Sequence, residues 1–354
     1  ITNTAVASSL TLNKTVVNGT TGATHTAADW SLSASGPTPI VGVSSGTQTF
    51  VSIGDYTLSE SGPDGYSASA WDCGDATVRD GVVTVSLGHN VVCTITNTAV
   101  ASSLTLNKTV VNGTTGATHV AADWSLSASG PTPVSSVTPG TKTTVQIGSY
   151  TLSESGPTGY TASAWDCGDA TVRDGVVTIP LGVDVVCSVT NTAITPTLTL
   201  QKTVDNGQTG ATHAADDWKL SATGPTSIVD VLSGTETPVA IGDYILSETG
   251  PEGYAASDWD CGDATIHDGV VTIALGQDVV CTVTNTATAS SLTLVKTVDN
   301  GSTGATHTAA DWELSAIGPS SMIDVASGTK ATVQIGSYTL SESGPTGYTA
   351  SAWD

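Results

Sequence analysis

The sequence repeats itself with a period of 94 residues. The same Leu-x-Leu-x-Lys pattern occurs four times, ending on Lys14, Lys108, Lys202 and Lys296. A fixed internal period indicates a tandem array of one structural unit, and a unit of this length can enclose a single hydrophobic core. We therefore expect four successive domains, which are residues 6–99, 100–193, 194–287 and 288–354.

The ends of the chain do not coincide with the ends of a repeat. Residues 1–5 match residues 95–99, so we expect them to be the last strand of a preceding unit. The fourth repeat stops at Asp354, which is the counterpart of Asp72, so it is truncated before its closing strands. We expect both ends to be cuts in a longer array.

Composition and pattern predict an all-β fold. Short runs of alternating apolar and polar residues are separated by 38 Gly and 14 Pro, and no segment keeps a helical period for long. The expected strands of the first repeat are Leu10–Val16, Trp30–Ala34, Ile40–Val43, Thr47–Ile53, Tyr56–Glu60, Tyr66–Trp71, Val82–Leu87 and Val91–Asn97. The last two are expected to close the domain as a hairpin around Gly88, and each unit is expected to be a β-sandwich.

The charge balance excludes several classes of partner. Thirty-two acidic residues against nine basic ones give a formal charge of -23, and no cluster of Lys or Arg occurs. Nucleic-acid backbones and anionic lipids both need positive charge at the contact, so we expect neither as a partner. There is also no run of eighteen apolar residues, which argues against membrane insertion of this segment.

The repeated lysine lies on the apolar face of its strand. Alternate side chains of a strand share a face, so Lys14 points the same way as Leu10 and Leu12. An isolated ammonium group in a protein interior is costly, so the fold must supply partners. Two other strands end their inward face on a polar residue, namely Glu60 after Tyr56 and Leu58, and Asn97 after Cys93 and Ile95. The same sets recur as Lys108, Glu154 and Asn191, then Lys202, Glu248 and Asn285, while Lys296 and Glu342 lack an Asn and Asn3 lacks a Lys.

Three interpretations of this triad remain open. The lysine can be a strand-end residue whose ammonium group reaches water, as long basic side chains often do. The three side chains can form a buried hydrogen-bonded cluster. Alternatively, a neutral lysine amine can attack the carbonyl carbon of the Asn side chain while the Glu carboxyl polarises that carbonyl and transfers protons. This reaction would release ammonia in a single turnover and would need no cofactor. Recurrence of the parity and spacing in three full units favours the covalent bond.

The six cysteines occur as one pair in each complete repeat. Members of a pair are twenty residues apart, with no C-x-x-C motif and no histidine ligand nearby. This spacing predicts disulfides within the closing hairpin and an oxidising, extracellular location rather than a zinc site. The expected pairs are Cys73 with Cys93, Cys167 with Cys187, and Cys261 with Cys281.

Other recurring polar and aromatic residues give weaker signals. His25, with its counterparts His119, His213 and His307, has no second ligand at metal-binding spacing. Acidic turns such as that of Asp72 and Asp75 lack the ligand series of a calcium loop, so no metal is expected. Trp30, Trp71, Tyr56 and Tyr66 are interpreted as core or disulfide-packing residues.

Three features of each complete repeat resemble those of a known family. They are a Lys ending the first strand, the stretch YTLSESGPDGY from Tyr56 to Tyr66, and an Asn closing the last strand within ITNT. Together they resemble the Cna B-type, prealbumin-like domains of Gram-positive surface proteins and pilins. The resemblance implies an Ig-like sandwich in which Lys and Asn are joined by an intramolecular isopeptide bond, promoted by Glu60 and its counterparts Glu154, Glu248 and Glu342.

The resemblance also implies a structural role. The expected function is that of an extracellular stalk or filament subunit on a bacterial surface, with neighbouring repeats and other copies as partners. The linker from Thr98 to Ser103 contains no Gly or Pro, which favours tight joining of successive domains. The alternative is a multivalent adhesin, which predicts an exposed aromatic or charged cluster repeated on one face. No repeating constellation suggests an enzyme with turnover.

Overall fold

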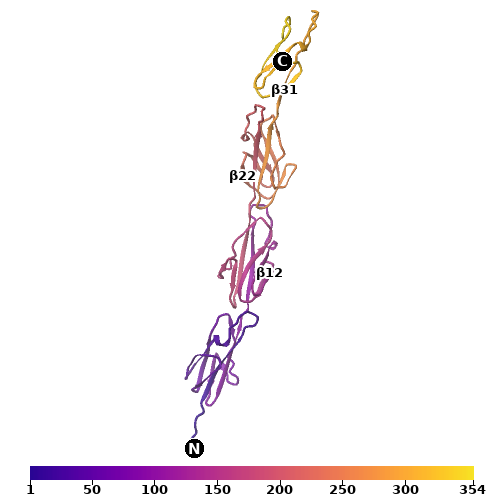
Figure 1. Ribbon diagram of the computed structural model, residues 1–354. Helices are drawn as coiled ribbons and strands as arrows, with labels where there is room; N and C mark the ends of the chain where they lie inside the picture. The colour runs from indigo at the N-terminus through magenta and orange to yellow at the C-terminus, as the bar shows by residue number, and fades with distance from the viewer. The chain divides into compact units, whose positions relative to one another are not determined.

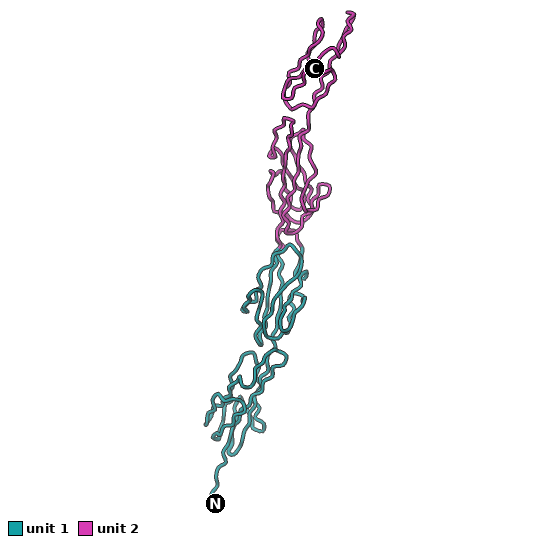
Figure 2. Tube along the Cα trace, viewed as in Figure 1, with its two compact units in different colours: residues 1–111, 118–192 teal, residues 112–117, 193–354 magenta.

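The computed structural model describes residues 1–354, which form two compact units. One unit consists of residues 1–111 and 118–192, and the other of residues 112–117 and 193–354 (Figure 2). The prediction of an all-β chain is confirmed, because the only helical segments are four single 3-10 turns. Figure 1 shows the strands of each repeat gathered into a separate body.

The first repeat contains nine strands and one 3-10 turn. They are β1 (Ser8–Val17), η1 (Ala27–Asp29), β2 (Ser31–Ser35), β3 (Ile40–Val43), β4 (Thr47–Val51), β5 (Gly54–Ser61), β6 (Tyr66–Ala68), β7 (Val78–Arg79), β8 (Val82–Val85) and β9 (Asn90–Ala99).

Two sheets face each other in this repeat. The first has the order β4-β1-β9-β6 and the second the order β3-β2-β5-β8-β7. β1 and β9 pair in parallel, whereas the other neighbours pair antiparallel. The chain therefore enters the sandwich through β1 and leaves it through the strand beside it.

The second and third repeats have the same two sheets. The second contains β10 (Ser102–Val111), η2 (Ala121–Asp123), β11 (Ser125–Ser129), β12 (Val134–Val137), β13 (Lys142–Val145), β14 (Gly148–Ser155), β15 (Tyr160–Ala162), β16 (Val172–Arg173), β17 (Val176–Ile179) and β18 (Asp184–Ala193). The third contains β19 (Thr197–Asp205), η3 (Ala215–Asp217), β20 (Lys219–Thr223), β21 (Ile228–Val231), β22 (Thr235–Pro238), β23 (Gly242–Thr249), β24 (Tyr254–Ala256), β25 (Ile266–His267), β26 (Val270–Ile273) and β27 (Asp278–Ala287).

The fourth repeat is an incomplete sandwich. It contains β28 (Ser290–Leu294), η4 (Ala309–Asp311), β29 (Glu313–Ile317), β30 (Met322–Val325), β31 (Thr329–Val333) and β32 (Thr339–Ser343). β28 pairs only with β31, since the chain has no counterpart of β9 to lie on its other side. β28 is consequently five residues long, against ten residues for β1.

The core of each complete repeat is built by the alternation seen in the sequence. Leu10 and Leu12 from β1 pack with Leu32, Tyr56 and Cys93, and all five side chains are fully buried. Inward residues of both sheets thus fill one core per repeat, as sandwich packing requires.

The predicted closing hairpin is wrong. β8 pairs with β5 and β7 in the five-stranded sheet, whereas β9 pairs with β1 and β6 in the four-stranded sheet. The residues between them, 86–89, carry the chain from one sheet to the other. A glycine-centred turn marks a chain reversal in both arrangements, so the turn residues alone did not distinguish them.

Some segments lie outside the sandwiches or form only short helical turns. Residues 1–5 form no strand and are exposed. None of the helical turns has the length and apolar character needed to cross a membrane.

Candidate functional site

The repeated lysine is buried and bound to a carboxylate of the opposite sheet. Lys14 projects from β1 with no exposed side-chain surface, and its Nζ donates a hydrogen bond to Oε2 of Glu60 on β5. The same ion pair joins Lys108 to Glu154 at 2.5 Å and Lys202 to Glu248 at 2.5 Å. Because the lysines are fully enclosed in these three repeats, the interpretation as a water-exposed strand end is wrong.

Burial changes the acid–base behaviour of two of these lysines. Removal from water lowers the pKa of Lys14 below its ordinary value, although the hydrogen bond and charge of Glu60 raise it in part. The pKa of Lys202 is lowered for the same reason and raised in part by Glu248. Burial therefore favours the neutral, nucleophilic amine in both repeats.

The indole of Trp30 forms one wall of the site. Lys14 Nζ lies 4.9 Å from the centre of the indole, within the range of a cation–π contact. On another side the ring packs against Gly62, where an added Cβ would lie 2.4 Å from the indole Cδ1. The corresponding lysines of the other repeats lie 5.1 Å from Trp124, Trp218 and Trp312.

From the sequence alone, this tryptophan is interpreted only as a core residue. The available signal was its constant position sixteen residues after each repeated lysine. Tyr66 extends the cluster, since its ring meets Trp30 edge-on at 4.9 Å and its hydroxyl donates to Asn18 Oδ1 at 2.5 Å. Burial, with a smaller contribution from Asp29, raises the pKa of the Tyr66 hydroxyl and keeps it protonated.

Asn97 lies on the strand beside Lys14. In the parallel register, Ile95 is opposite Lys14 and Asn97 is opposite Val16, so Asn97 is displaced by two residues on the same face. Diagonal neighbours at this offset are within reach of a long side chain. Asn97 is buried, and its Oδ1 has no hydrogen-bond partner.

The orphaned amide oxygen is found in every complete repeat. Oδ1 of Asn191 and of Asn285 is likewise buried and without a partner. An unsatisfied buried acceptor costs about 1–3 kcal/mol, so native proteins rarely keep one without a reason. The three predicted residue types are thus brought to one end of each core, from β1, β5 and β9 in the first repeat.

The fourth repeat shows what the closing strand contributes. Lys296 and Glu342 still form an ion pair at 2.6 Å, but their side chains are 16% and 22% exposed. They line an open pocket of about 270 Å³ together with Trp353 and Asp354. The enclosure of the lysine therefore depends on the neighbouring strand that carries the Asn in the other repeats.

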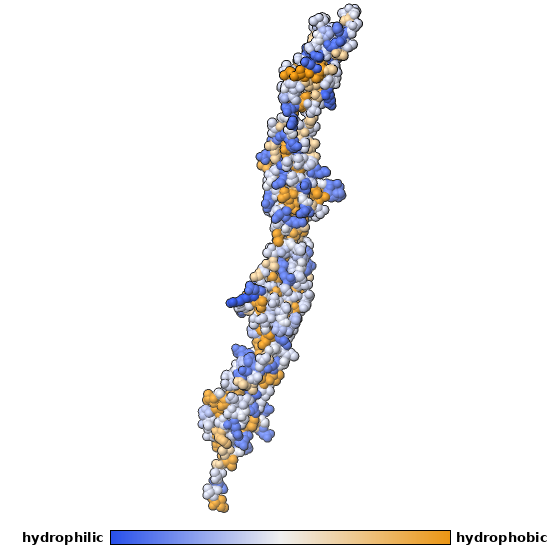
Figure 3. All heavy atoms as spheres, viewed as in Figure 1, coloured by the Kyte–Doolittle hydropathy of each residue, from blue (hydrophilic) through white to orange (hydrophobic).

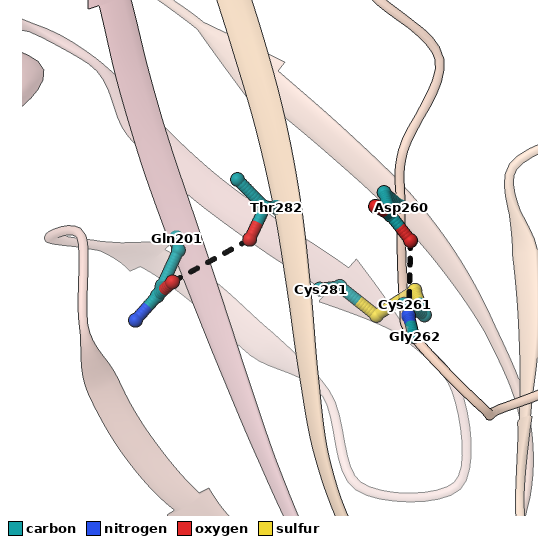
Figure 4. The surroundings of a disulfide bond; sticks show 6 residues. All are labelled: Gln201, Asp260, Cys261, Gly262, Cys281 and Thr282. Atoms are coloured by element: carbon teal, nitrogen blue, oxygen red, sulfur yellow. Dashed lines mark hydrogen bonds between the residues drawn. A yellow bond between two sulfur atoms is a disulfide. The ribbon is translucent and has the colours of Figure 1, made fainter.

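The three predicted cysteine pairs form disulfides, and all six cysteines are buried. Cys93 lies on β9, whereas Cys73 belongs to the segment on the outer side of β9, which forms a bridge between Asp72 and Thr94. The bond therefore fastens the last strand to its outer neighbour, and Cys73 lies outside the predicted hairpin of residues 82–97. Figure 4 shows the equivalent bond between Cys261 and Cys281. It also shows the hydrogen bond from the Thr282 hydroxyl to Oε1 of Gln201 on the adjacent strand, at 3.4 Å.

The remaining polar candidates form local structure. His25 accepts or donates a hydrogen bond with the Tyr66 hydroxyl at 3.2 Å, whereas His119 pairs with Asp123 at 3.1 Å. The backbone amide of Val120 and the His119 ring lower the pKa of Asp123. No group of three or more His, Cys, Asp or Glu side chains is arranged to hold a metal ion.

A family model described as a prealbumin-like fold domain matches residues 6–95, 100–189, 194–283 and 287–354. The chain belongs to this family. Its model occurs once in each of the four repeats, which makes the chain a tandem array of prealbumin-like sandwich domains.

Several solved structures are similar to parts of this chain, all at low identity and low TM-score. The Bacillus anthracis TIE protein is 16% identical with a TM-score of 0.41, over 80% of this chain and 51% of that one. The pilus adhesin SpaC from Lactobacillus rhamnosus GG, in its open conformation, is 12% identical with a TM-score of 0.23, over 80% of this chain and 44% of that one. The major pilin T-13 from Streptococcus pyogenes is 15% identical with a TM-score of 0.23, over 52% of this chain and 97% of that one.

The prealbumin-like array spans about half the length of the first two of these structures. No curated protein matches its sequence. The family assignment therefore rests on the domain model, which matches all four repeats.

Proposed function

We propose that each complete repeat is closed by an isopeptide bond between its lysine and its asparagine, and that the array is a structural segment of an extracellular stalk or filament. The observation that supports this most is the combination found three times: an enclosed Lys–Glu pair beside an Asn whose buried Oδ1 has no partner. A protonated Glu carboxyl would donate to that oxygen, both before and after the bond forms.

The chemistry needs only the three side chains. The Lys14 ammonium passes a proton to the Glu60 carboxylate, which leaves a neutral amine and a neutral acid. The amine attacks Cγ of Asn97 while the acid donates to Oδ1, and the C–Nδ2 bond then breaks. The leaving nitrogen takes the second amine proton and departs as ammonia, so a Lys ammonium, a Glu carboxylate and a primary amide become a secondary amide, a protonated Glu and NH₃. Because the fold holds the groups together, the step is effectively unimolecular.

The position of the bond suits a protein that carries load. Force applied to the chain enters the first repeat at the start of β1 and leaves at the end of β9, and these strands are parallel neighbours. A bond from Lys14 to Asn97 would join the two strands directly. Tension would then pass through the crosslink and bypass the residues between them.

The disulfides support an extracellular location. Structural disulfides persist in oxidising compartments and are rare where thiols are kept reduced. Each complete repeat carries one such bond, and the chain has no free cysteine. The negative surface would also keep a repetitive β protein soluble.

The adhesin alternative finds less support on the surface. It predicts an exposed aromatic or charged cluster repeated on one face. For the aromatic kind, the large exposed apolar residues include only two aromatic ones, Phe50 and Trp353. The counterparts of Phe50 are Thr144, Pro238 and Thr332, so this feature does not repeat.

The mass of the intact chain tests the proposal. After reduction of the disulfides, the chain should be lighter than its sequence by three molecules of ammonia, one for each complete repeat. Substituting Asn97→Ala should reduce the deficit to two, and the Lys296–Glu342 pair provides an internal site that loses none. A reduced chain with the full sequence mass would refute the crosslinks.

A further inference from the structure

The last strand of each complete repeat must be in register before its Asn can react. Asn97 lies on β9 and comes close to Lys14 only when β9 is paired in parallel with β1. That pairing joins distant parts of the chain, since 82 residues lie between Lys14 and Asn97. Closing so long a loop costs more conformational entropy than closing a short one. Whatever holds β9 in register therefore affects the reaction as well as the fold.

The site itself opposes the docking of β9 as long as the bond is absent. With β9 in place, the Lys14 side chain has no exposed surface, and Oδ1 of Asn97 is buried without a hydrogen-bond partner. Burial of an ion pair and burial of an unsatisfied amide oxygen both cost free energy. The second and third repeats bear the same cost. The unreacted strand is therefore expected to leave its place more readily than an ordinary core strand.

The chain on the outer side of β9 pairs with it irregularly. We call residues 66–73 the outer segment. Its regular ladder ends where Ala68 pairs with Asn97, and the Thr96 amide then donates to the side chain of Ser69 at 3.0 Å. The next backbone pair is between Asp72 and Thr94, so the outer segment holds one residue more than β9 over this stretch. An extra residue of this kind interrupts the ladder, as in a β-bulge.

The outer segment also has little apolar packing. Residues 67–70 are Ser, Ala, Ser and Ala and are exposed, and of residues 67–72 only Trp71 packs against the core. Weakly apolar outward residues are common along the array, and Figure 3 shows a mostly pale visible surface, the colour of intermediate hydropathy. Segments with few buried apolar contacts and exposed backbone hydrogen bonds open at low free-energy cost. Noncovalent contacts alone are therefore expected to hold this edge weakly.

The disulfide fixes β9 to the outer segment at the far end of this irregular stretch. Cys73 and Cys93 are both buried, and each is next to a member of the bridging pair Asp72 and Thr94. At its other end the outer segment begins with Tyr66, which packs edge-on against Trp30 in the wall of the lysine site. The bond therefore ties β9 to a segment that is anchored beside Lys14.

The disulfide does not touch the reacting atoms. Cys93 and Asn97 both lie at buried positions of β9, four residues apart, which is about 13 Å at roughly 3.3 Å per residue. Figure 4 shows the equivalent bond in the third repeat, between Cys281 on β27 and Cys261 on the segment beside it. Any effect of the disulfide on the reaction must therefore pass through the position of the strand.

We infer that the disulfide positions the Asn for attack, so that each complete repeat forms its crosslink after its disulfide. The thiols of Cys73 and Cys93 are first oxidised to the disulfide by a small-molecule disulfide, which is reduced to two thiols. β9 then stays in register, and the Lys14 amine attacks Cγ of Asn97 with loss of ammonia as proposed above. The inference rests on the proposed isopeptide bond. It makes the two cysteines positioning residues, and it makes entry into an oxidising compartment the event that starts crosslinking.

The rate of ammonia loss from the newly made full chain tests the inference. The chain is produced by cell-free translation in oxidised or in reduced glutathione, and its mass is followed after translation is stopped, with all disulfides reduced before measurement. The oxidised chain should lose three molecules of ammonia, and the reduced chain should lose them about tenfold more slowly or less completely, because the rate follows the fraction of repeats in which β9 is docked. Adding oxidised glutathione to the reduced chain should restore the faster rate.

Serine substitutions in one repeat use the other repeats as internal controls. In oxidised glutathione, Cys73→Ser with Cys93→Ser should slow one of the three losses about tenfold, and peptide mapping should assign it to the Lys14 site. The second and third repeats should react at their normal rate. Ile40→Ala is the matched control for stability, since Ile40 is buried on β3 in the sheet that does not contain β9. It should slow the reaction much less than the serine pair does.

A surface substitution tests whether the outer segment carries the effect. Ser69→Ala removes the acceptor of the Thr96 amide at an exposed position, so it should leave the repeat folded. It should slow ammonia loss severalfold in the reduced chain and little in the oxidised chain, because the disulfide holds the same two segments together. An effect of equal size in both buffers would overturn the inference.

The outcomes separate this inference from the proposed crosslinks. Equal rates in oxidised and reduced glutathione, or a serine pair that reacts as fast as the unmodified repeat, would overturn the inference and leave the crosslinks standing. Slowing by Ile40→Ala equal to that of the serine pair would also overturn it, because the disulfide would then act only through overall stability. An oxidised chain that keeps its full sequence mass would refute the crosslinks, and the inference with them.

Discussion

Removal of one crosslink should make a single repeat extensible. The substitution Asn97→Ala leaves the Lys14–Glu60 pair in place but removes the carbonyl carbon that the amine attacks. The 82 residues between Lys14 and Asn97 would then become extensible under tension. At roughly 3.4 Å per residue they correspond to about 280 Å of contour length.

The disulfide determines how far the first repeat of the Asn97→Ala variant extends under tension in oxidised protein. Nineteen residues lie between Cys73 and Cys93, so an intact disulfide keeps about 65 Å of this contour length from extending, at roughly 3.4 Å per residue. The oxidised variant should therefore give an extension of about 215 Å, and the reduced variant the full length of about 280 Å. This difference follows directly from the disulfide lying inside the bypassed segment.

Single-molecule pulling from the two ends of the chain measures these steps. The second and third repeats keep their triads and serve as controls in the same molecule, while the incomplete fourth repeat extends in every sample. The unmodified chain should show no full-length extension of the first three repeats, with or without reductant. Such extensions in unmodified protein would refute the load-bearing role of the Lys–Asn bonds.

Three further results are expected. In a chain with Asn97→Ala and Asn285→Ala, the free energy of unfolding should increase as the pH rises towards 10.5, because the folded state holds the Lys14 and Lys202 protons less tightly than the unfolded state. The denaturant concentration at the midpoint of unfolding should therefore rise with pH. A midpoint that falls with pH would contradict this prediction. Gly62→Ala should destabilise the first repeat by about 1–3 kcal/mol in thermal unfolding, because the new methyl group would clash with the indole of Trp30. Ser61→Ala, at an exposed position, should change the stability little. Equal effects of the two substitutions would contradict the packing of Gly62 against Trp30. Reduction of the disulfides should lower the free energy of unfolding by about 3 kcal/mol per complete repeat, which should be seen as faster proteolysis. The mass lost as ammonia should stay the same. An unchanged rate of proteolysis would show that the disulfides do not stabilise the repeats.

The alternation of inward and outward positions along three strands was sufficient to predict which polar side chains point into the core. Lys14, Glu60 and Asn97 each occupy the inward position of a strand that otherwise carries apolar residues there. Because side chains alternate along a strand, this pattern places all three in the interior of any two-sheet sandwich. The cysteine pairs could be predicted for a related reason, since an oxidising compartment leaves two buried cysteines of one small repeat few alternatives.

Other features depended on pairings that the sequence does not encode locally. The turn at Gly88 is compatible with a hairpin and with a crossing between sheets, and only the pairing of β8 with β5 decides between them. The position of Trp30 over the lysine also depends on tertiary packing, because an aromatic residue that starts a buried strand is normally part of the core. Its contact with Gly62 joins the residue before β2 to the residue after β5, which are neighbouring strands of one sheet.

The most direct test of the account is an experimental density map of a complete repeat at a resolution that separates bonded from non-bonded atoms. The proposal predicts continuous density from Lys14 Nζ to Asn97 Cγ at the length of an amide bond, about 1.33 Å, with the Glu60 carboxyl against the amide oxygen. Separate Lys and Asn side chains at van der Waals distance, with the Asn nitrogen still present, would contradict it.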